Sequence, residues 1–267
     1  MQVVSQIEKD FISTNLKANK RLDFRQKTDL RKIKLTFGSS FGQCQVSLGK
    51  TKVTANVSCE ITRPGLSSST EGSIQFNTEI SPICCLDLPD VEVVISRMLE
   101  KSLRVSRAVD TEGLCIIAGE KVWSIKVDVR VIDHEGNLFD CCCLAAMAAL
   151  LHFRRPEVTV SGKDVIIHSV DDKVPIPLSI HHIPTSTTFG IYQENYILDP
   201  TLLEEQVADG ELVIVMNAHK EICCIKQSAS VATEEVLQCM QIASVKAVEL
   251  TAILKEAIKK DSESRNK

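Results

Sequence analysis

Residues 121–151, KVWSIKVDVRVIDHEGNLFDCCCLAAMAALL, contain the pattern that decides the fold of this chain. Up to Asp133 apolar and polar residues alternate, with Trp123 on one face and Lys126 on the other, which predicts a half-buried strand. Residues 140–151 are small or apolar nearly all round and predict a helix buried between layers, with Asp140 as its N-cap. A strand that leads into a buried helix requires further layers around that helix.

Shorter patterns on both sides of this pair supply those layers. Period-two alternation predicts strands within 33–59 and hairpins over 158–168, 187–198 and 212–225, and helical spacing predicts helices over 5–16, 91–109 and 236–258. In the first of these helices Ile7, Phe11 and Leu16 form the expected apolar face. The prolines of the connector before residue 185 indicate a boundary between two subdomains. We therefore divide the chain into a helix and basic arm (1–30), two subdomains (31–184 and 185–260) and a frayed polar tail (261–267).

The composition excludes several classes of protein. The chain has 267 residues and a formal charge of −4, so it gives no overall signal for nucleic acid, and a polyanion site has to be local. No stretch approaches the roughly 18 apolar residues of a transmembrane helix, and we expect no membrane partner. The 11 cysteines lie singly or side by side in apolar runs without a CxxC pair, which favours small buried side chains in a reducing compartment.

The residues at the start of the buried helix argue against catalysis with phosphate. No Ser, Thr, Lys or Arg lies between Glu135 and Asp140, and these two acids would repel an anion at the helix N-terminus. A second candidate is an acidic segment, which could bind magnesium or act as acid and base but fits a solvated loop better: Asp199, Glu204, Glu205, Asp209 and Glu211. His181 and His182 lack a third metal ligand at ordinary spacing. We therefore assign no catalytic residue, no metal site and no cofactor.

Two basic regions are the remaining candidates for function. Residues 17–34 carry eight Lys or Arg and two Asp, a segment charge of +6 that could equally be a solvated loop. Within 91–109 we expect Val94 and Val105 on the buried face and four cations on the opposite, exposed face, here called the basic stripe: Arg97, Lys101, Arg104 and Arg107. Only 4% of residues are aromatic, so the stripe would follow the phosphate backbone of a nucleic acid rather than stack bases.

Longer motifs occur along nearly the whole chain. They include Arg21-Leu22-Asp23-Phe24-Arg25 with Arg31, Leu48-Gly49-Lys50-Thr51-Lys52-Val53, Thr70-Glu71-Gly72, Asp110-Thr111-Glu112-Gly113-Leu114-Cys115, Ala118-Gly119-Glu120-Lys121-Val122-Trp123, His152-Phe153-Arg154-Arg155-Pro156 and Pro177-Leu178-Ser179-Ile180-His181-His182. Together they resemble the RNase PH family, which usually has Gly where Phe24 stands. More narrowly, they resemble the RNase PH-like ring subunits of the eukaryotic RNA exosome, of the polymyositis/scleroderma autoantigen type.

This resemblance implies a fold and a function. The fold is α/β (α+β), with two subdomains that each have a mixed β-sheet packed by helices. Catalytic members hold phosphate with a Gly-Gly-Ser/Thr-Arg segment, and residues 136–139 at that place lack both the hydroxyl and the arginine. Their conserved aspartate falls near Glu211. The implied role is a catalytically inactive scaffold and RNA-channel subunit, whose basic stripe binds RNA.

The resemblance also implies partners and a location. The partners are other RNase PH-like chains in a six-membered ring, RNA-binding cap subunits, a separate hydrolytic nuclease and single-stranded RNA. The location is the nucleus, including the nucleolus, and the cytoplasm, and the process is 3′-to-5′ RNA processing and decay, including that of rRNA. Two alternatives stay open: a phosphate-dependent 3′-to-5′ exoribonuclease, and a purely structural subunit whose basic residues contact proteins.

Overall fold

The computed structural model describes residues 5–17, 20–65, 69–84, 90–161, 164–168, 172–192 and 195–265. Its larger sheet has the strand order β1-β2-β3-β6-β4, with β5 beside β6. The β4–β6 pair is parallel and the others are antiparallel, so this sheet is mixed, as expected. Its strands are β1 (Ile33–Phe37), β2 (Gln43–Leu48), β3 (Thr51–Thr62), β4 (Ser73–Ile80), β5 (Cys115–Ile117) and β6 (Lys121–Asp133).

A second sheet has the order β12-β11-β13-β14 and is antiparallel throughout. The expectation of a mixed sheet therefore holds only for the first one. The second sheet contains β11 (Thr185–Tyr192), β12 (Asn195–Leu198), β13 (Gly210–Met216) and β14 (Ile222–Gln227). Smaller elements complete the strands: β7 (Arg154–Arg155) pairs with β10 (Ile176–Pro177), and β8 (Val158–Ser161) forms a hairpin with β9 (Asp164–Ile167). The tips of two predicted hairpins, at 162–163 and 193–194, lie outside the described residues.

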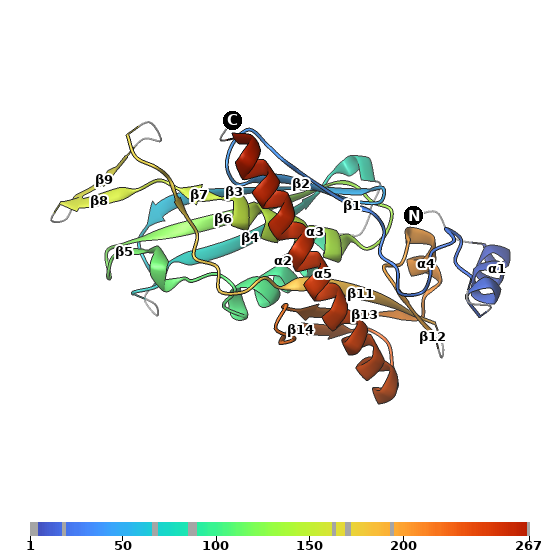
Figure 1. The fold of residues 1–267 in the computed structure, drawn as a ribbon. Coiled ribbons are helices and arrows are strands. Elements are labelled where there is room, and N and C mark those ends of the chain that lie inside the picture. Colours follow the sequence, from blue (N-terminus) through green and yellow to red (C-terminus); the bar gives the residue numbers. More distant parts are fainter. Residues whose placement is uncertain are drawn as a thin grey trace.

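Helix α3 (Leu138–His152) connects the two sheets. It packs on β2, β3 and β6 of the first sheet and on β11 of the second, and every residue except Leu151 is buried. This confirms the helix between layers that the sequence predicts, because an all-apolar helix surface needs cover on every side. Figure 1 shows α3 behind the long helix α5 (Thr233–Arg265), near the centre of the molecule.

Helix α5 is longer than the sequence indicated. Its buried side includes Ala243, Ala247 and Leu250, and it joins the cores of both sheets. The polar tail predicted from residue 261 is not frayed over its described part, because Arg265 donates hydrogen bonds to the carbonyls of Gly38 and Ser39 and so fixes the helix end. By length and composition alone α5 could also cross a membrane. Its buried side supplies part of that apolar content, and Val245, Val248 and Ile253 on the same helix are exposed.

Helix α2 (Val91–Leu99) continues into a π-helical segment, Glu100–Val105, labelled η2. The sequence predicted one regular helix to residue 109 with Val94 and Val105 buried, and both side chains are exposed. A π turn holds more residues than an α turn and rotates the following side chains. Leu103 therefore faces the core in place of Val105, and Val109 forms a separate bridge with Ile180.

Helix α1 (Gln6–Lys17) packs beside α4 (Leu202–Val207) at one end of the molecule (Figure 1). Ile12 and Leu16 contact the side chains of Tyr192 and Ile197. Two residues of the predicted apolar face, Ile7 and Phe11, are instead exposed. Short 3-10 turns occur at Pro82–Cys84 (η1) and Glu112–Leu114 (η3).

Candidate nucleic-acid interface

The basic stripe lies on α2, on η2 and in the turn that follows. Arg97, Lys101, Arg104 and Arg107 are all exposed, as the sequence predicted. The Arg104 guanidinium lies 2.8 Å from the Glu100 carboxylate one turn earlier, and its side chain remains 50% exposed. Arg107 has left the helix and has a φ of 55°. Three stripe cations therefore follow one another along one helical segment, and the fourth extends the stripe past its end.

The basic arm behaves differently from the stripe. The side chain of Arg21 is only 1% exposed and forms a paired contact with the carboxylate of Glu204, at 2.7 and 3.0 Å. The same guanidinium donates to the carbonyls of Leu198 and Asp199, both at 2.9 Å. Two nitrogens on one carboxylate fix both the position and the orientation of the side chain. This arginine is therefore an internal connection between the arm and the second sheet.

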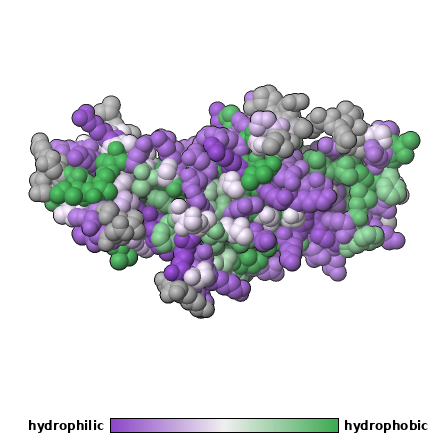
Figure 2. All heavy atoms as spheres, turned by 90° about the horizontal axis from the view of Figure 1, so that it is seen from above, coloured by the Kyte–Doolittle hydropathy of each residue, from purple (hydrophilic) through white to green (hydrophobic). Residues whose placement is uncertain are grey.

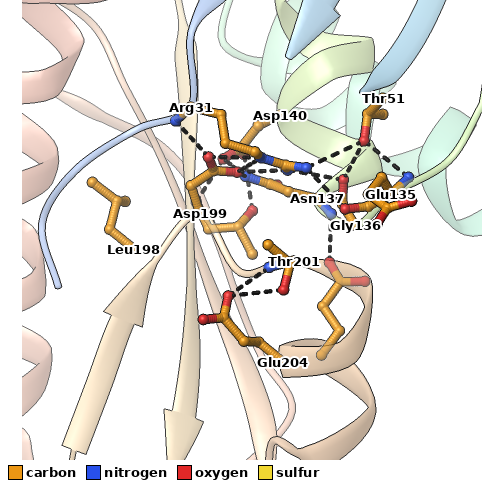
Figure 3. Close-up of polar contacts among 12 residues, drawn as sticks. Arg31, Thr51, Glu135, Gly136, Asn137, Asp140, Leu198, Asp199, Thr201 and Glu204 are labelled. Atoms are coloured by element: carbon orange, nitrogen blue, oxygen red, sulfur yellow. Dashed lines mark hydrogen bonds and ion pairs between the residues drawn. The ribbon is translucent and has the colours of Figure 1, made fainter. Parts of the chain in front are cut away.

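Asp199 is the centre of a second internal network (Figure 3). Its side chain is 0% exposed and lies 2.9 Å from a nitrogen of Arg25 and 2.8 Å from one of Arg31. The amide nitrogen of the Asn137 side chain donates to it at 2.7 Å. Burial alone would raise the pKa of Asp199, but the hydrogen bonds and charge of Arg31 outweigh burial and lower it. The carboxylate is therefore held in its charged form.

These contacts correct the expectation of a solvated acidic loop. Asp199 and Glu204 are buried, and each is bound by arginines from the arm. Glu211, which the resemblance places near the conserved aspartate of catalytic members, pairs with Lys226 across the neighbouring strands. Within the described part of the chain, no group of three or more His, Cys, Asp or Glu side chains has the geometry of a metal site.

The mouth of α3 is closed by its own neighbours. Asn137 is the N-cap residue, with a φ of 52°, and its backbone amide donates to the carboxylate of Glu205 at 2.6 Å. Asp140 was predicted as the N-cap, and this is wrong, since it is the third residue of the helix. Its carboxylate instead accepts hydrogen bonds from the amide and hydroxyl of Thr188, at 2.9 and 2.8 Å, and so ties α3 to β11. Burial raises the pKa of Asp140 to about 6.

Arg31 is the cation nearest to this mouth in the network, and its donors are already used. Its guanidinium donates to Asp199, to the carbonyl of Glu135 at 2.8 Å and to the carbonyl of Gly136 at 3.0 Å (Figure 3). The hydroxyl of Thr51 also binds the Gly136 carbonyl, at 2.8 Å. A phosphate ion at the helix start would therefore meet these carboxylates and carbonyl oxygens.

Beside this mouth is a cleft of about 460 Å³ between α2, the start of α3 and the second sheet. Apolar side chains form much of its wall: Val91, Val94, Ile95, Met98, Leu138, Phe139 and Val213. Burial raises the pKa of Glu205, which lines the cleft, to about 7, and burial lowers the pKa of His134. The cleft combines apolar walls with carboxyl groups, and its lysine, Lys226, is paired with Glu211, so this chemistry does not favour inorganic phosphate.

The cysteines of α3 do not act as nucleophiles. Burial raises the pKa of Cys141 and Cys143 to about 12, so both stay thiols near neutral pH. The cysteines that the structure describes are all free, and the expected burial holds for Cys44, Cys239 and the three of α3, whereas the others are partly buried. Sequence reasoning missed Asn137 and the three arm arginines as one network. The only signal of these contacts in the sequence was the opposite charge of the basic arm and the acidic segment, which lie about 170 residues apart.

Comparison with known proteins gives one consistent family. Residues 29–156 match the family described as "3′ exoribonuclease family, domain 1" (RNase PH), and residues 182–246 match its domain 2. The chain is 44% identical to "Exosome complex component RRP45" of Bos taurus over 98% of its own length, and it spans 62% of that relative. It is 39% identical to the Schizosaccharomyces pombe component rrp45, over 95% of this chain and 90% of the relative.

A solved structure agrees with these sequences. A chain of the "archaeoglobus fulgidus exosome with RNA bound to the active site" superposes with a TM-score of 0.82 and 26% sequence identity. The superposition covers 92% of this chain and 97% of that one. The likeness therefore extends across both sheets.

Proposed function

Because this chain belongs to the RNase PH family of 3′ exoribonucleases, we propose that it is a non-catalytic scaffold and RNA-channel subunit of an exosome ring. In this role it supports 3′-to-5′ processing and decay of rRNA, mRNA and other RNAs. Its partners are other RNase PH-like chains in a six-membered ring, RNA-binding cap subunits and a separate hydrolytic nuclease. It acts in the nucleus, including the nucleolus, and in the cytoplasm. The relatives named as exosome components support this assignment.

The basic stripe is the RNA contact of this proposal. Its four cations remain exposed, whereas the arginines at positions 21, 25 and 31 of the arm form ion pairs with buried carboxylates. Exposed Arg and Lys side chains bind phosphates of single-stranded RNA without reading the bases. This suits a channel wall, over which RNA of any sequence has to pass.

The absence of catalysis rests on one observation, the occupied mouth of α3. Phosphorolysis needs phosphate beside the RNA 3′ end, and the family places it at this helix start. Here the carboxylate of Glu205 accepts a hydrogen bond from the backbone amide of Asn137. The guanidinium of Arg31 donates its hydrogen bonds to Asp199 and to the carbonyls of Glu135 and Gly136. Bringing in an anion would require breaking these contacts and placing it against carboxylates.

Charge reversal in a reconstituted ring tests the channel role. We expect the double variant Arg97→Glu, Arg104→Glu to shorten or abolish the RNA segment that the ring protects from added nuclease. The matched control is Lys255→Glu, Lys259→Glu, which reverses two exposed charges on α5 and should leave protection unchanged. Unchanged protection with the stripe variant would contradict the channel role.

A phosphate-dependence assay tests the lack of catalysis. Purified protein, alone or with an RNase PH-like partner, is incubated with RNA in the presence and absence of inorganic phosphate. We expect no release of nucleoside diphosphates that depends on this chain. Release that disappears with Glu211→Ala, or with Asp199→Ala in a variant that is still folded by circular dichroism, would show a phosphorolytic enzyme instead.

A further inference from the structure

Phe24 has an unusual combination of exposure and backbone conformation. Its side chain is 97% exposed, and its φ is 62°, in the left-handed region that bulky residues seldom occupy. The backbone amide of Phe24 donates to the carbonyl of Arg21 at 3.2 Å, which closes a tight turn. A large apolar side chain is therefore held in water, in a conformation that a glycine would adopt without strain.

The turn that carries Phe24 is fixed on both sides. Arg21 is bound to Glu204 before it, and Arg25 is bound to Asp23 and Asp199 after it. These charged contacts pre-organise the turn, so a partner that receives the ring does not have to order this loop. Rigid presentation of an aromatic ring is typical of an anchor residue in a protein interface.

Other exposed apolar residues lie in this turn, on α4, which the turn contacts through Arg21, and on α1. Leu22 belongs to the turn itself, Leu203 lies on α4 next to Glu204, and Ile7 and Phe11 lie on α1, which packs on α4. Figure 2 shows apolar atoms at the end of the molecule where Figure 1 places α1. This end therefore presents an apolar surface beyond the single ring of Phe24.

We propose that Phe24 is an anchor residue that inserts into an apolar pocket of a neighbouring RNase PH-like chain. The inference deepens the proposed ring function and rests on it. Figure 1 shows α1 and the β8–β9 hairpin at opposite ends of an elongated molecule, with α2 between them. In a closed ring each subunit contacts neighbours through two different surfaces. The proposed contact makes the end with α1 and Phe24 one of these two surfaces.

The two arginines that flank Phe24 favour a protein over RNA. The guanidinium of Arg21 is almost fully buried, and that of Arg25 is engaged with two carboxylates. Neither is available for an RNA phosphate, although base stacking on an aromatic ring normally occurs beside free cations. An apolar pocket needs no such charge.

The test uses Phe24→Asn, because Asn tolerates the left-handed conformation and removes the ring. Each neighbouring RNase PH-like chain of the exosome is titrated against the wild type and the variant, and thermal unfolding of the variant is measured alone. We expect the variant to unfold about 2–4 °C higher, because the strain at this position is relieved, and to lose about tenfold or more in affinity for one neighbour.

Two further variants make the result specific. Phe24→Trp keeps an aromatic ring and should retain association, and Val245→Asn removes an exposed apolar side chain of α5 and should not change the affinity. Equal affinities of wild type and Phe24→Asn for every neighbour would overturn the inference and leave the ring function standing. Failure of the wild type to bind any of these chains would overturn both. Crosslinking of RNA to the aromatic ring of Phe24 would show that this side chain binds a nucleic acid, and would overturn the inference of a protein partner.

Discussion

The two basic regions of this chain look alike as sequence and differ as structure. The arm has a segment charge of +6, and the basic stripe has four cations near a single Glu100. In the structure the arm arginines at positions 21, 25 and 31 are buried or nearly so against Asp199 and Glu204, whereas the stripe side chains are exposed. A run of cations therefore indicates a polyanion site only after its counter-charges in the rest of the chain have been located.

Removal of an arm arginine should have the largest effect on stability. Arg31→Ala leaves the fully buried Asp199 with one fewer cation, and an incompletely compensated buried charge typically costs about 3–5 kcal/mol. Because Arg25 still contacts Asp199, we expect about 3 kcal/mol in urea denaturation. The double variant Arg31→Ala, Asp199→Asn should recover part of this loss. A loss below about 1 kcal/mol in the single variant would show that the network is not structural.

Glu205 adds a contrast to the arm arginines, because this acid forms no ion pair with any of them. Burial raises its folded pKa to about 7, above the ordinary 4.5 of an unfolded chain. Between these values the folded state binds more protons, so this group lowers the free energy of unfolding as pH rises. Glu205→Gln should therefore gain stability relative to wild type between pH 5 and pH 8, by about 2 kcal/mol. A difference that stays constant with pH would contradict the raised pKa.

The sequence pattern within one segment was sufficient to predict the elements whose buried face follows a regular strand or helix spacing. The strand over 121–133 and the buried helix after it follow directly from the alternation of Trp123, Ile125 and Val127 and from the uniform apolar surface of α3. The position of the four stripe cations at the surface followed from helical spacing as well. In these cases the residues that decide the structure lie within one segment.

Contacts between distant segments could not be read from the sequence. Asp140 has the residue type of an N-cap, yet its partner is Thr188 on another strand, and Asn137 takes the cap position. The arm and the acidic segment attract each other across about 170 residues, and composition does not say which cation meets which acid. The π turn after Leu99 also escaped prediction, because no proline or glycine marks it.

The stripe side chains should contribute least to stability. Arg97→Ala and Lys101→Ala each remove an exposed side chain, and such changes usually shift the free energy of unfolding by no more than about 0.5 kcal/mol. Urea denaturation of the two variants measures this directly. A loss above about 1.5 kcal/mol in either would place that cation in the fold, as in the arm, and remove the contrast between the two regions.

The salt dependence of RNA binding tests the central claim most directly. In a reconstituted ring, the four stripe cations at positions 97, 101, 104 and 107 are replaced by Gln, and the Kd for unstructured RNA is measured over a range of salt concentrations. Each phosphate contact with single-stranded RNA contributes about 0.7 to the slope of log affinity against log salt. The account predicts that the slope becomes shallower by about 3. A slope unchanged from wild type would show that the basic stripe does not contact RNA.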